Sequence, residues 1–204
     1  MALARRHVQG RQSEMTDIVV LAEEPSGRIV AECLAERLGI SGRTLCLEHQ
    51  GKGDLERSFP RKISGWRSPR LPRFVVMRDN DGVDCLELKR KLTGLVPKAA
   101  LARVKIRIVV QELESWYIGD LDAVGRAGLV NENVLALHKS KARFRKPDEI
   151  RHAKQMFKDK IVPGGQIELA RSIGPHLSLT SNRSKSFHAF VGALRWAAEE
   201  LVAA

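Results

Sequence analysis

Four short apolar runs along the chain are followed by segments with a helical pattern of apolar residues. The runs cover residues 18–21, 44–47, 74–77 and 104–110. We expect each run to be a strand, with helices over 25–38, from a capping Asp54 toward Trp66, and around 85–92. The apolar face of the last of these helices should carry Cys85, Leu86, Leu88 and Leu92. This alternation is typical of βαβ units and of a mostly parallel sheet. Lys105 and Arg107 alternate with apolar residues in the fourth run, so that strand should lie nearer an edge.

Beyond Gln111 the pattern becomes helical, is interrupted by Gly and Pro, and closes with a helix from about residue 184 to 202. The sequence therefore predicts an α/β protein with a mostly parallel four-stranded sheet flanked by helices, followed by a helical C-terminal part. We expect a disordered basic tail over residues 1–16, an α/β domain over 17–118 and a helical region over 119–204 packed on it.

The charge balance indicates a polyanionic partner. Lys and Arg number 35 against 24 Asp and Glu, which gives a net charge of +11 and favours nucleic acid. No apolar run approaches the roughly 20 residues that span a bilayer, and no secretory signal is present, so we expect a cytoplasmic protein without membrane contact. The 3 cysteines show no CxxC spacing and should be reduced core residues. The oligomeric state stays open.

Acidic residues stand where three of the predicted strands end. Glu23 and Glu24 follow the first strand, Asp79 and Asp81 the third, and Glu112 and Glu114 the fourth. Ligands of open parallel sheets bind beyond the carboxyl ends of the strands, and carboxylate oxygens suit Mg²⁺ or Mn²⁺.

Spacing and local alternatives limit this interpretation. Residues two apart in an extended chain point the same way, so Asp79 and Asp81 could converge on one ion. Glu112 and Glu114 would do so only if the strand continues; if Glu112 opens a helix, Glu114 points elsewhere. Each cluster taken alone is also explained by helix capping, a turn or a helix dipole.

These residues resemble known families. A Glu that closes the first strand and an Asp-x-Asp that closes the third resemble the Toprim domain of topoisomerases, primases and OLD-type nucleases. The chain resembles more closely, over nearly its whole length after Met15, the bacterial family called domain of unknown function 4276 (DUF4276). The runs that carry this second resemblance are Leu21–Ser26, His49–Leu55, Arg78–Asp81 with Asp84 and Cys85, Glu112–Asp120, and Asn182–Phe187.

The resemblance implies a Toprim/Rossmann-like sheet and a role for each acidic residue. Glu23 matches the Toprim glutamate, a general acid or base, Asp79 and Asp81 match the metal-binding pair, and Glu112 or Glu114 would add a ligand. If Glu23 and Asp79 share one ion, strands one and three are neighbours and the strand order is 2-1-3-4. Glu24 stands where the Toprim pattern has Gly, which argues against topoisomerase or primase chemistry.

Basic side chains supply candidate contacts to phosphate. Lys52 lies in a glycine-rich loop after the second strand, where a plain turn is an equal interpretation. Arg57 and Arg61 follow on a helix near Trp66, and could line a strand path or form a solvated face. Arg183 and Lys185 stand at the expected start of the last helix, whose positive end attracts phosphate.

Our leading hypothesis is a Mg²⁺-dependent Toprim-type nuclease or related phosphodiester-cleaving enzyme, acting in defence against foreign DNA. The alternative is a noncatalytic Toprim-like subunit that binds nucleic acid or a partner protein, with an ATPase as the partner that the resemblance suggests. A dinucleotide-binding protein is disfavoured, because the first strand-to-helix turn lacks GxGxxG and carries two glutamates. DNA versus RNA and endonuclease versus exonuclease action stay open.

Overall fold

Four parallel strands form one sheet in the order β2-β1-β3-β4. In the computed structural model, which describes residues 16–199, the strands are β1 (Ile18–Ala22), β2 (Thr44–Glu48), β3 (Arg73–Asp79) and β4 (Val104–Val109). The predicted strand order and parallel pairing are confirmed. β1 takes a central position because all five of its residues are apolar and buried. β4 lies at an edge, as Lys105 and Arg107 predicted.

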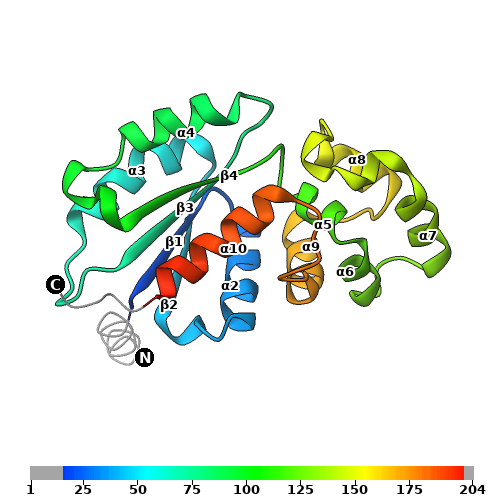
Figure 1. Ribbon diagram of the computed structural model, residues 1–204, viewed down its shortest axis with the longest axis horizontal. Coiled ribbons are helices and arrows are strands. Elements are labelled where there is room, and N and C mark those ends of the chain that lie inside the picture. The colour runs from blue at the N-terminus through cyan, green and yellow to red at the C-terminus, as the bar shows by residue number, and fades with distance from the viewer. Residues whose placement is uncertain (1–15, 200–204) are drawn as a thin grey trace.

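Helices cover both faces of this sheet and continue beyond it (Figure 1). The α-helices are α2 (Pro25–Arg37), α3 (Lys52–Gly65), α4 (Cys85–Gly94), α5 (Glu114–Gly119), α6 (Leu121–Arg126), α7 (Glu132–Ser140), α8 (Ala153–Lys160), α9 (Gln166–Ile173) and α10 (Lys185–Ala198). Short 3₁₀ turns are η1 (Ser41–Arg43), η2 (Lys98–Arg103), η3 (Ala142–Arg145), η4 (Pro147–Glu149) and η5 (Gly174–His176). Within residues 16–199 no helix is long and apolar enough to cross a membrane.

The alternation of side chains along β1 divides the interior into two cores. Val19 and Leu21 pack with side chains of α3 and α4 on one face. Ile18 and Val20 pack with α2 and α10 on the other face, in a larger core that extends into the helices after β4. The closing helix of the C-terminal region is therefore part of the layer that covers the sheet, because its apolar face completes the burial of β3 and β4.

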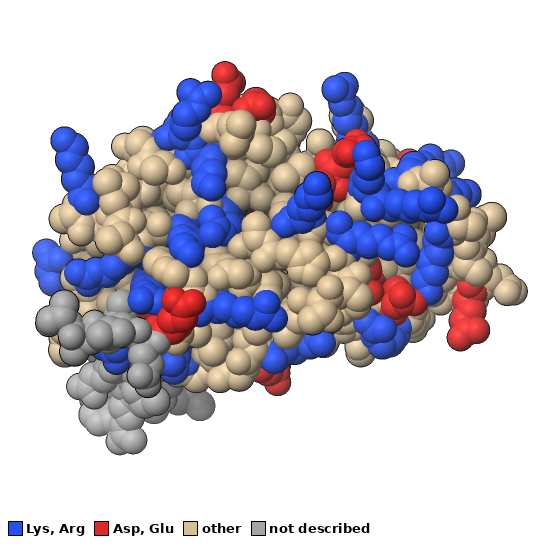
Figure 2. Space-filling model, viewed as in Figure 1, with Lys and Arg blue, Asp and Glu red and all other residues tan. Residues whose placement is uncertain are grey.

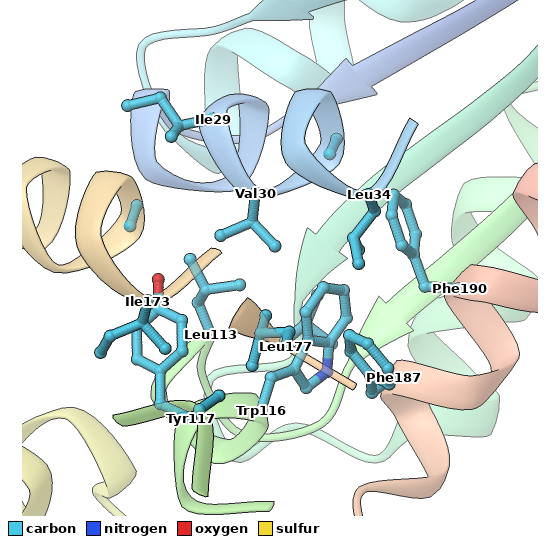
Figure 3. Packing of buried hydrophobic residues seen from close by; sticks show 14 of the residues in the cluster. Ile29, Val30, Leu34, Leu113, Trp116, Tyr117, Ile173, Leu177, Phe187 and Phe190 are labelled. Atoms are coloured by element: carbon cyan, nitrogen blue, oxygen red, sulfur yellow. The ribbon is translucent and has the colours of Figure 1, made fainter. Parts of the chain in front are cut away.

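Trp116 joins the sheet to the helical region at the centre of the larger core (Figure 3). Its indole Nε1 donates to Ser186 Oγ at 2.9 Å, and its ring packs edge-on against Phe187 with centroids 5.3 Å apart. Tyr117, beside it, is 1% exposed, so the sole tyrosine of the sequence is a core residue. Figure 3 shows the Trp116 ring between α2 and α10, and the Tyr117 ring on the other side, near Ile173 of α9.

Two local expectations differ from the structure. α3 begins at Lys52, after Gly51 with φ 82°, and Asp54 accepts a hydrogen bond from Gln50 N at 3.0 Å instead of capping the helix. Leu86 was expected on the apolar face of α4 but is 71% exposed. Of the tail predicted over residues 1–16, only Thr16 lies within the described residues.

The turn between α5 and α6 requires Gly119. Asn182 Nδ2 donates to the Trp116 carbonyl, and Arg183 N donates to the Gly119 carbonyl, both at 2.9 Å. A Cβ at Gly119 would stand 2.2 Å from Asn182 Oδ1, which accepts from Ser184 N. The close approach ties the start of α10 to α5.

We expect Gly119→Ala to destabilise the protein by about 1–3 kcal/mol, because Asn182 is held by its own hydrogen bonds and cannot move aside without loss. The free energy of unfolding from urea titrations measures the effect. Gly192→Ala is the matched control, since Gly192 lies within α10 with open space around it, and should be neutral or stabilising by up to about 1 kcal/mol. Equal effects of the two substitutions would contradict this account of the turn.

Candidate metal centre

The carboxyl ends of β1 and β3 meet at the point where the strand order reverses. The register pairs Ala22 with Met77, which brings Glu23 to the level of Arg78, and Asp79 is the next residue and the last of β3. Open parallel sheets bind their ligands at this switch point. A small pocket of about 10 Å³ opens there, lined by Glu23, Glu24, Ser26, Gly27, Met77, Asp79 and Leu113. It admits a body the size of one water molecule or one bare cation.

Glu23 reaches from the end of β1 toward β3. Its Oε2 accepts a hydrogen bond from Asp79 N at 3.2 Å, which holds the carboxylate across the pocket. Burial raises the pKa of Glu23, and the nearby positive charge of Arg78 partly opposes the rise. A carboxyl group with a raised pKa exchanges protons closer to neutral pH, which suits the predicted role of a general acid or base.

Asp79 is the most strongly perturbed carboxyl group of the cluster. Burial is the largest cause that raises its pKa well above the ordinary value, and repulsion from Glu23, Glu114, Glu24 and Asp81 adds to it. Burial and nearby negative charge both disfavour the ionised form of a carboxyl group. A proton or a cation at the carboxyl end of β3 would relieve this repulsion.

Glu114 points into the same region from the first turn of α5. It is 2% exposed, and within the described residues its Oε2 has no hydrogen-bond partner. Burial raises its pKa to about 7. The buried Tyr117 hydroxyl also lacks a partner there, and burial, with a smaller contribution from Glu114, raises its pKa. Buried polar atoms normally have partners, so an unpartnered carboxylate oxygen indicates a missing ligand or proton.

Asp81 does not point the same way as Asp79, because the chain leaves the extended conformation. Asp81 has φ 49°, and its carboxylate pairs with Lys52 Nζ at 3.3 Å and Arg78 Nη1 at 3.6 Å. Asn80 holds the turn in place by donating to the Val83 carbonyl at 2.8 Å. Asp81 therefore lies near the cluster with its charge already partly neutralised.

Glu112 and Glu114 diverge, which is the alternative that the sequence left open. β4 ends at Val109, and Gln111 has φ 64°, so the chain turns before α5. Glu112 Oε2 accepts a hydrogen bond from Lys154 N, in the first turn of α8, at 2.8 Å. Glu114 instead lies close enough to Asp79 to contribute to its raised pKa, and of the two it is the better candidate ligand.

A cleft of about 460 Å³ lies next to the acidic pocket, between the turns after β3 and β4 and the start of α8. It is lined by Asp81, Gly82, Gln111, Glu112, Arg151 and His152. Asp81, Gln111 and His152 are the non-glycine residues with positive φ in the described part of the chain, and all three line this cleft. Each such residue costs on the order of 1–3 kcal/mol, and strain of this kind gathers at functional sites.

The predicted basic residues take different positions. Lys52 contacts the site through Asp81, whereas Arg57 and Arg61 lie exposed on α3. Arg183 lines a separate pocket with Asp120, Asp122 and Lys139, so the structure does not bring it to the acidic pocket. Lys185 is exposed at the start of α10. Figure 2 shows Lys and Arg spread over the visible face, densely around α7 and α8.

Sequence reasoning missed three basic residues at the site. Arg78 is a buried cation inside an apolar strand, and it pairs with Glu56 at 3.4 Å as well as with Asp81. A charged residue within such a run was a usable signal. Arg151 and His152 are exposed in the cleft, and their side chains make no hydrogen bond or ion pair within residues 16–199. Both lie within residues 139–160, a segment rich in Lys and Arg, so nothing in the sequence distinguished them from their neighbours.

The donor set fits a divalent cation only in part. Within the described chain no three acidic, His or Cys side chains already stand close enough to hold one metal ion. Glu23, Asp79 and Glu114 nevertheless lie near one another without any Lys or Arg ion pair, and Glu114 keeps a buried free oxygen. Small movements of these side chains would present oxygen ligands of the kind that Mg²⁺ and Mn²⁺ prefer.

A comparison of sequences gives the family. The profile described as "Domain of unknown function (DUF4276)" matches residues 17–195. The chain belongs to the DUF4276 family. The predicted family is thus confirmed over nearly the whole DUF4276 chain, and no curated protein matches it in sequence.

Solved structures share the fold of the DUF4276 chain. The C-terminal region of the Xanthomonas campestris pv. campestris OLD protein superposes with a TM-score of 0.53 at 12% identity, over 89% of this chain and 95% of that one. The C-terminal region of the Burkholderia pseudomallei OLD protein gives a TM-score of 0.50 at 14% identity, over 88% and 98%. At this identity the likeness shows the fold, and it confirms the Toprim-like sheet that the sequence predicted.

We expect the metal-free protein to lose stability as the pH rises from about 4.5 to about 7. The Glu114 carboxyl binds its proton more tightly in the folded than in the unfolded chain, so its contribution is present below the unfolded pKa and is lost toward the folded pKa. The free energy of unfolding, measured by urea titration in EDTA across this pH range, should fall by up to about 3 kcal/mol because of this group. Glu114→Gln should flatten the profile, whereas Glu132→Gln, on the exposed first turn of α7, should leave it unchanged. An unaltered slope in Glu114→Gln would contradict the assignment.

Proposed function

We propose that this protein is a divalent-cation-dependent enzyme that cleaves phosphodiester bonds in nucleic acid. The observation that supports the proposal is the buried carboxylate cluster of Glu23, Asp79 and Glu114 at the switch point of the sheet. In the described chain these three side chains have no Lys or Arg ion pair, in contrast to Asp81. A cluster that only stabilised the fold would be expected to contain its own counter-charges.

Mg²⁺ or Mn²⁺ would be held by Glu23 and Asp79, with Glu114 as a third ligand and Asp81 as a ligand after release from Lys52. The bound ion would polarise a phosphoryl oxygen and lower the pKa of water at the site. Glu23 would exchange a proton with the reacting water or leaving oxygen. The first turn of α2 adds the backbone N–H groups of Ser26 and Gly27, which have no acceptor inside the helix and favour anions.

The strained cleft beside the carboxylates would bind the nucleic-acid substrate. Arg151 and His152 stand opposite Asp81 and Glu112 across a volume that can hold a nucleotide unit. A guanidinium that lacks an internal partner binds phosphate without first breaking an ion pair. The net charge of +11 would draw a polyanion toward this edge of the sheet.

Defence against foreign DNA and work with an ATPase partner are wider parts of the same proposal. Support comes from the structural similarity to two OLD proteins. In each of them the similar part is the C-terminal region, so a further segment precedes this fold.

The first test compares cleavage of nucleic acid by the wild type and by Asp79→Asn in Mg²⁺ and in Mn²⁺. We expect Asp79→Asn to lower the rate at least about a hundredfold, because it removes a ligand that the proposed site requires. Asp159→Asn, on the far turn of α8, is the matched control and should keep the wild-type rate. Equal metal-dependent rates in wild type and Asp79→Asn would remove the proposed centre.

One observation favours a noncatalytic subunit as the second candidate. Asp81, half of the predicted metal pair, is already engaged by Lys52 and Arg78. If this pairing persists, the protein would bind nucleic acid or a partner without holding a cation.

Thermal unfolding with added Mn²⁺ separates the two candidates. A cation at 100 times its dissociation constant should stabilise the wild type by about 2.7 kcal/mol, and Glu23→Gln should abolish the shift. A shift that is absent from the wild type, or unchanged in Glu23→Gln, favours the noncatalytic subunit.

A further inference from the structure

An open groove that combines an aromatic ring with basic side chains lies along the last turns of α3 beside β2. It has a volume of about 570 Å³ and is lined by Leu47, Arg61, Lys62, Gly65, Trp66 and Arg67. None of these residues belongs to the acidic pocket or to the strained cleft. The groove therefore offers a second surface with its own chemistry.

The positive charges of the groove are not neutralised within the described chain. Arg61 Nε donates to the Arg57 carbonyl at 3.0 Å, and Arg67 Nη1 donates to the Ser64 carbonyl at 3.1 Å. Lys62 Nζ lies 2.8 Å from His49 Nε2. Within residues 16–199 none of the three cations forms an ion pair, so an anion could engage all of them without displacing a carboxylate.

Trp66 supplies a fixed aromatic surface among these charges. Its ring packs edge-on against Phe74 of β3, with centroids 5.6 Å apart and an interplanar angle of 84°. The indole is only half-buried, and Gly65 beside it has nothing within 4 Å of the position of a Cβ. A flat ligand therefore has space to lie beside a ring that does not need to be ordered on binding.

The groove connects to the acidic pocket through hydrogen bonds. Lys62 contacts His49 Nε2, and His49 Nδ1 lies 2.8 Å from the carbonyl oxygen of Ala22, the residue before Glu23. His49 is 2% exposed, and because its Nδ1 donates to a carbonyl, its Nε2 accepts from the Lys62 ammonium. One end of the groove thus approaches the carboxyl end of β1.

We propose that this groove binds a single strand of nucleic acid, with one base stacked on Trp66 and the adjoining phosphates paired with Arg61, Lys62 and Arg67. Unpaired bases expose the flat faces that stack on aromatic side chains, whereas a duplex hides them. Binding in the groove needs no metal. Only the further step, in which the bound strand is directed toward Glu23, rests on the proposed function.

The test measures binding of a short fluorescein-labelled oligothymidylate by anisotropy, with the full chain in EDTA. Trp66→Phe should keep most of the affinity, because it keeps a ring, and Trp66→Leu should lose about tenfold. Quenching of tryptophan fluorescence by unlabelled oligothymidylate is the second measurement, and it should vanish in Trp66→Phe. Equal affinity of Trp66→Leu and Trp66→Phe would overturn the stacking assignment. Quenching of tryptophan fluorescence in Trp66→Phe that is as strong as in the wild type would also overturn it.

The charges are tested by the salt dependence of the same binding. Arg61→Gln and Arg67→Gln should each reduce the slope of log affinity against log salt by about 0.7. Arg171→Gln, which removes the same charge from exposed α9, should leave slope and affinity unchanged. Equal losses of affinity in all three variants would show nonspecific attraction and overturn the site. Polyglutamate or a duplex of matched length that binds as tightly as oligothymidylate would also overturn it.

The outcome is separable from that of the proposed function. If oligothymidylate binding in EDTA depends on Trp66, the proposed role of the groove is supported even when the protein cleaves no nucleic acid in Mg²⁺ or Mn²⁺. Cleavage that is lost in Asp79→Asn, together with oligothymidylate binding that ignores Trp66, would sustain the metal centre and overturn the groove.

Discussion

Electrostatic repulsion between buried carboxylates is the constraint on which the functional edge of this protein depends. The parallel pairing of β1 with β3 brings Glu23 close to Asp79, and α5 adds Glu114 nearby. Burial raises the pKa of each group, and repulsion from Glu23 and Glu114 adds to the rise at Asp79, so bound protons or a cation would stabilise this arrangement. The rest of the structure holds them at this spacing.

Trp116 and α10 supply much of that support. The ring lies in the core between α2 and α10, and Ser186 accepts its indole hydrogen. Asp148 accepts from Ser184 Oγ at 2.6 Å and from Ser186 N at 2.9 Å, which ties the start of α10 to the segment before α8. The helices after β4 are thereby fixed against the sheet, and α8 is held at the carboxyl edge, where it closes the strained cleft.

The distribution of positive charge complements the acidic pocket. Arg78 and Lys52 take part of the charge of Asp81, whereas Arg151 and His152 remain open toward the cleft. The groove at Trp66 adds unpaired cations on another face. A polyanion could therefore contact the protein at more than one surface around the same edge of the sheet.

The sequence by itself determined the sheet and the place of its acidic edge. The apolar runs of β1 and β3 could be buried only at the centre of a parallel sheet, and the polar alternation in β4 assigned it to an edge. Glu23 directly follows β1 and Asp79 is the last residue of β3, so the parallel pairing of the two strands brings them together.

Tertiary structure alone decided which other residues join them. The left-handed turns at Asp81 and Gln111 direct Asp81 toward Lys52 and Glu112 toward α8. The sequence allowed a turn at Asp81, but the partner of each carboxylate depends on elements far apart in the chain. Arg151 enters the cleft because α8 folds back over the sheet edge, a contact between segments far apart in the chain. The period of apolar residues and the spacing of polar ones predict which residues share a face of one helix or strand. Packing between the elements decides which side chains of different elements come into contact.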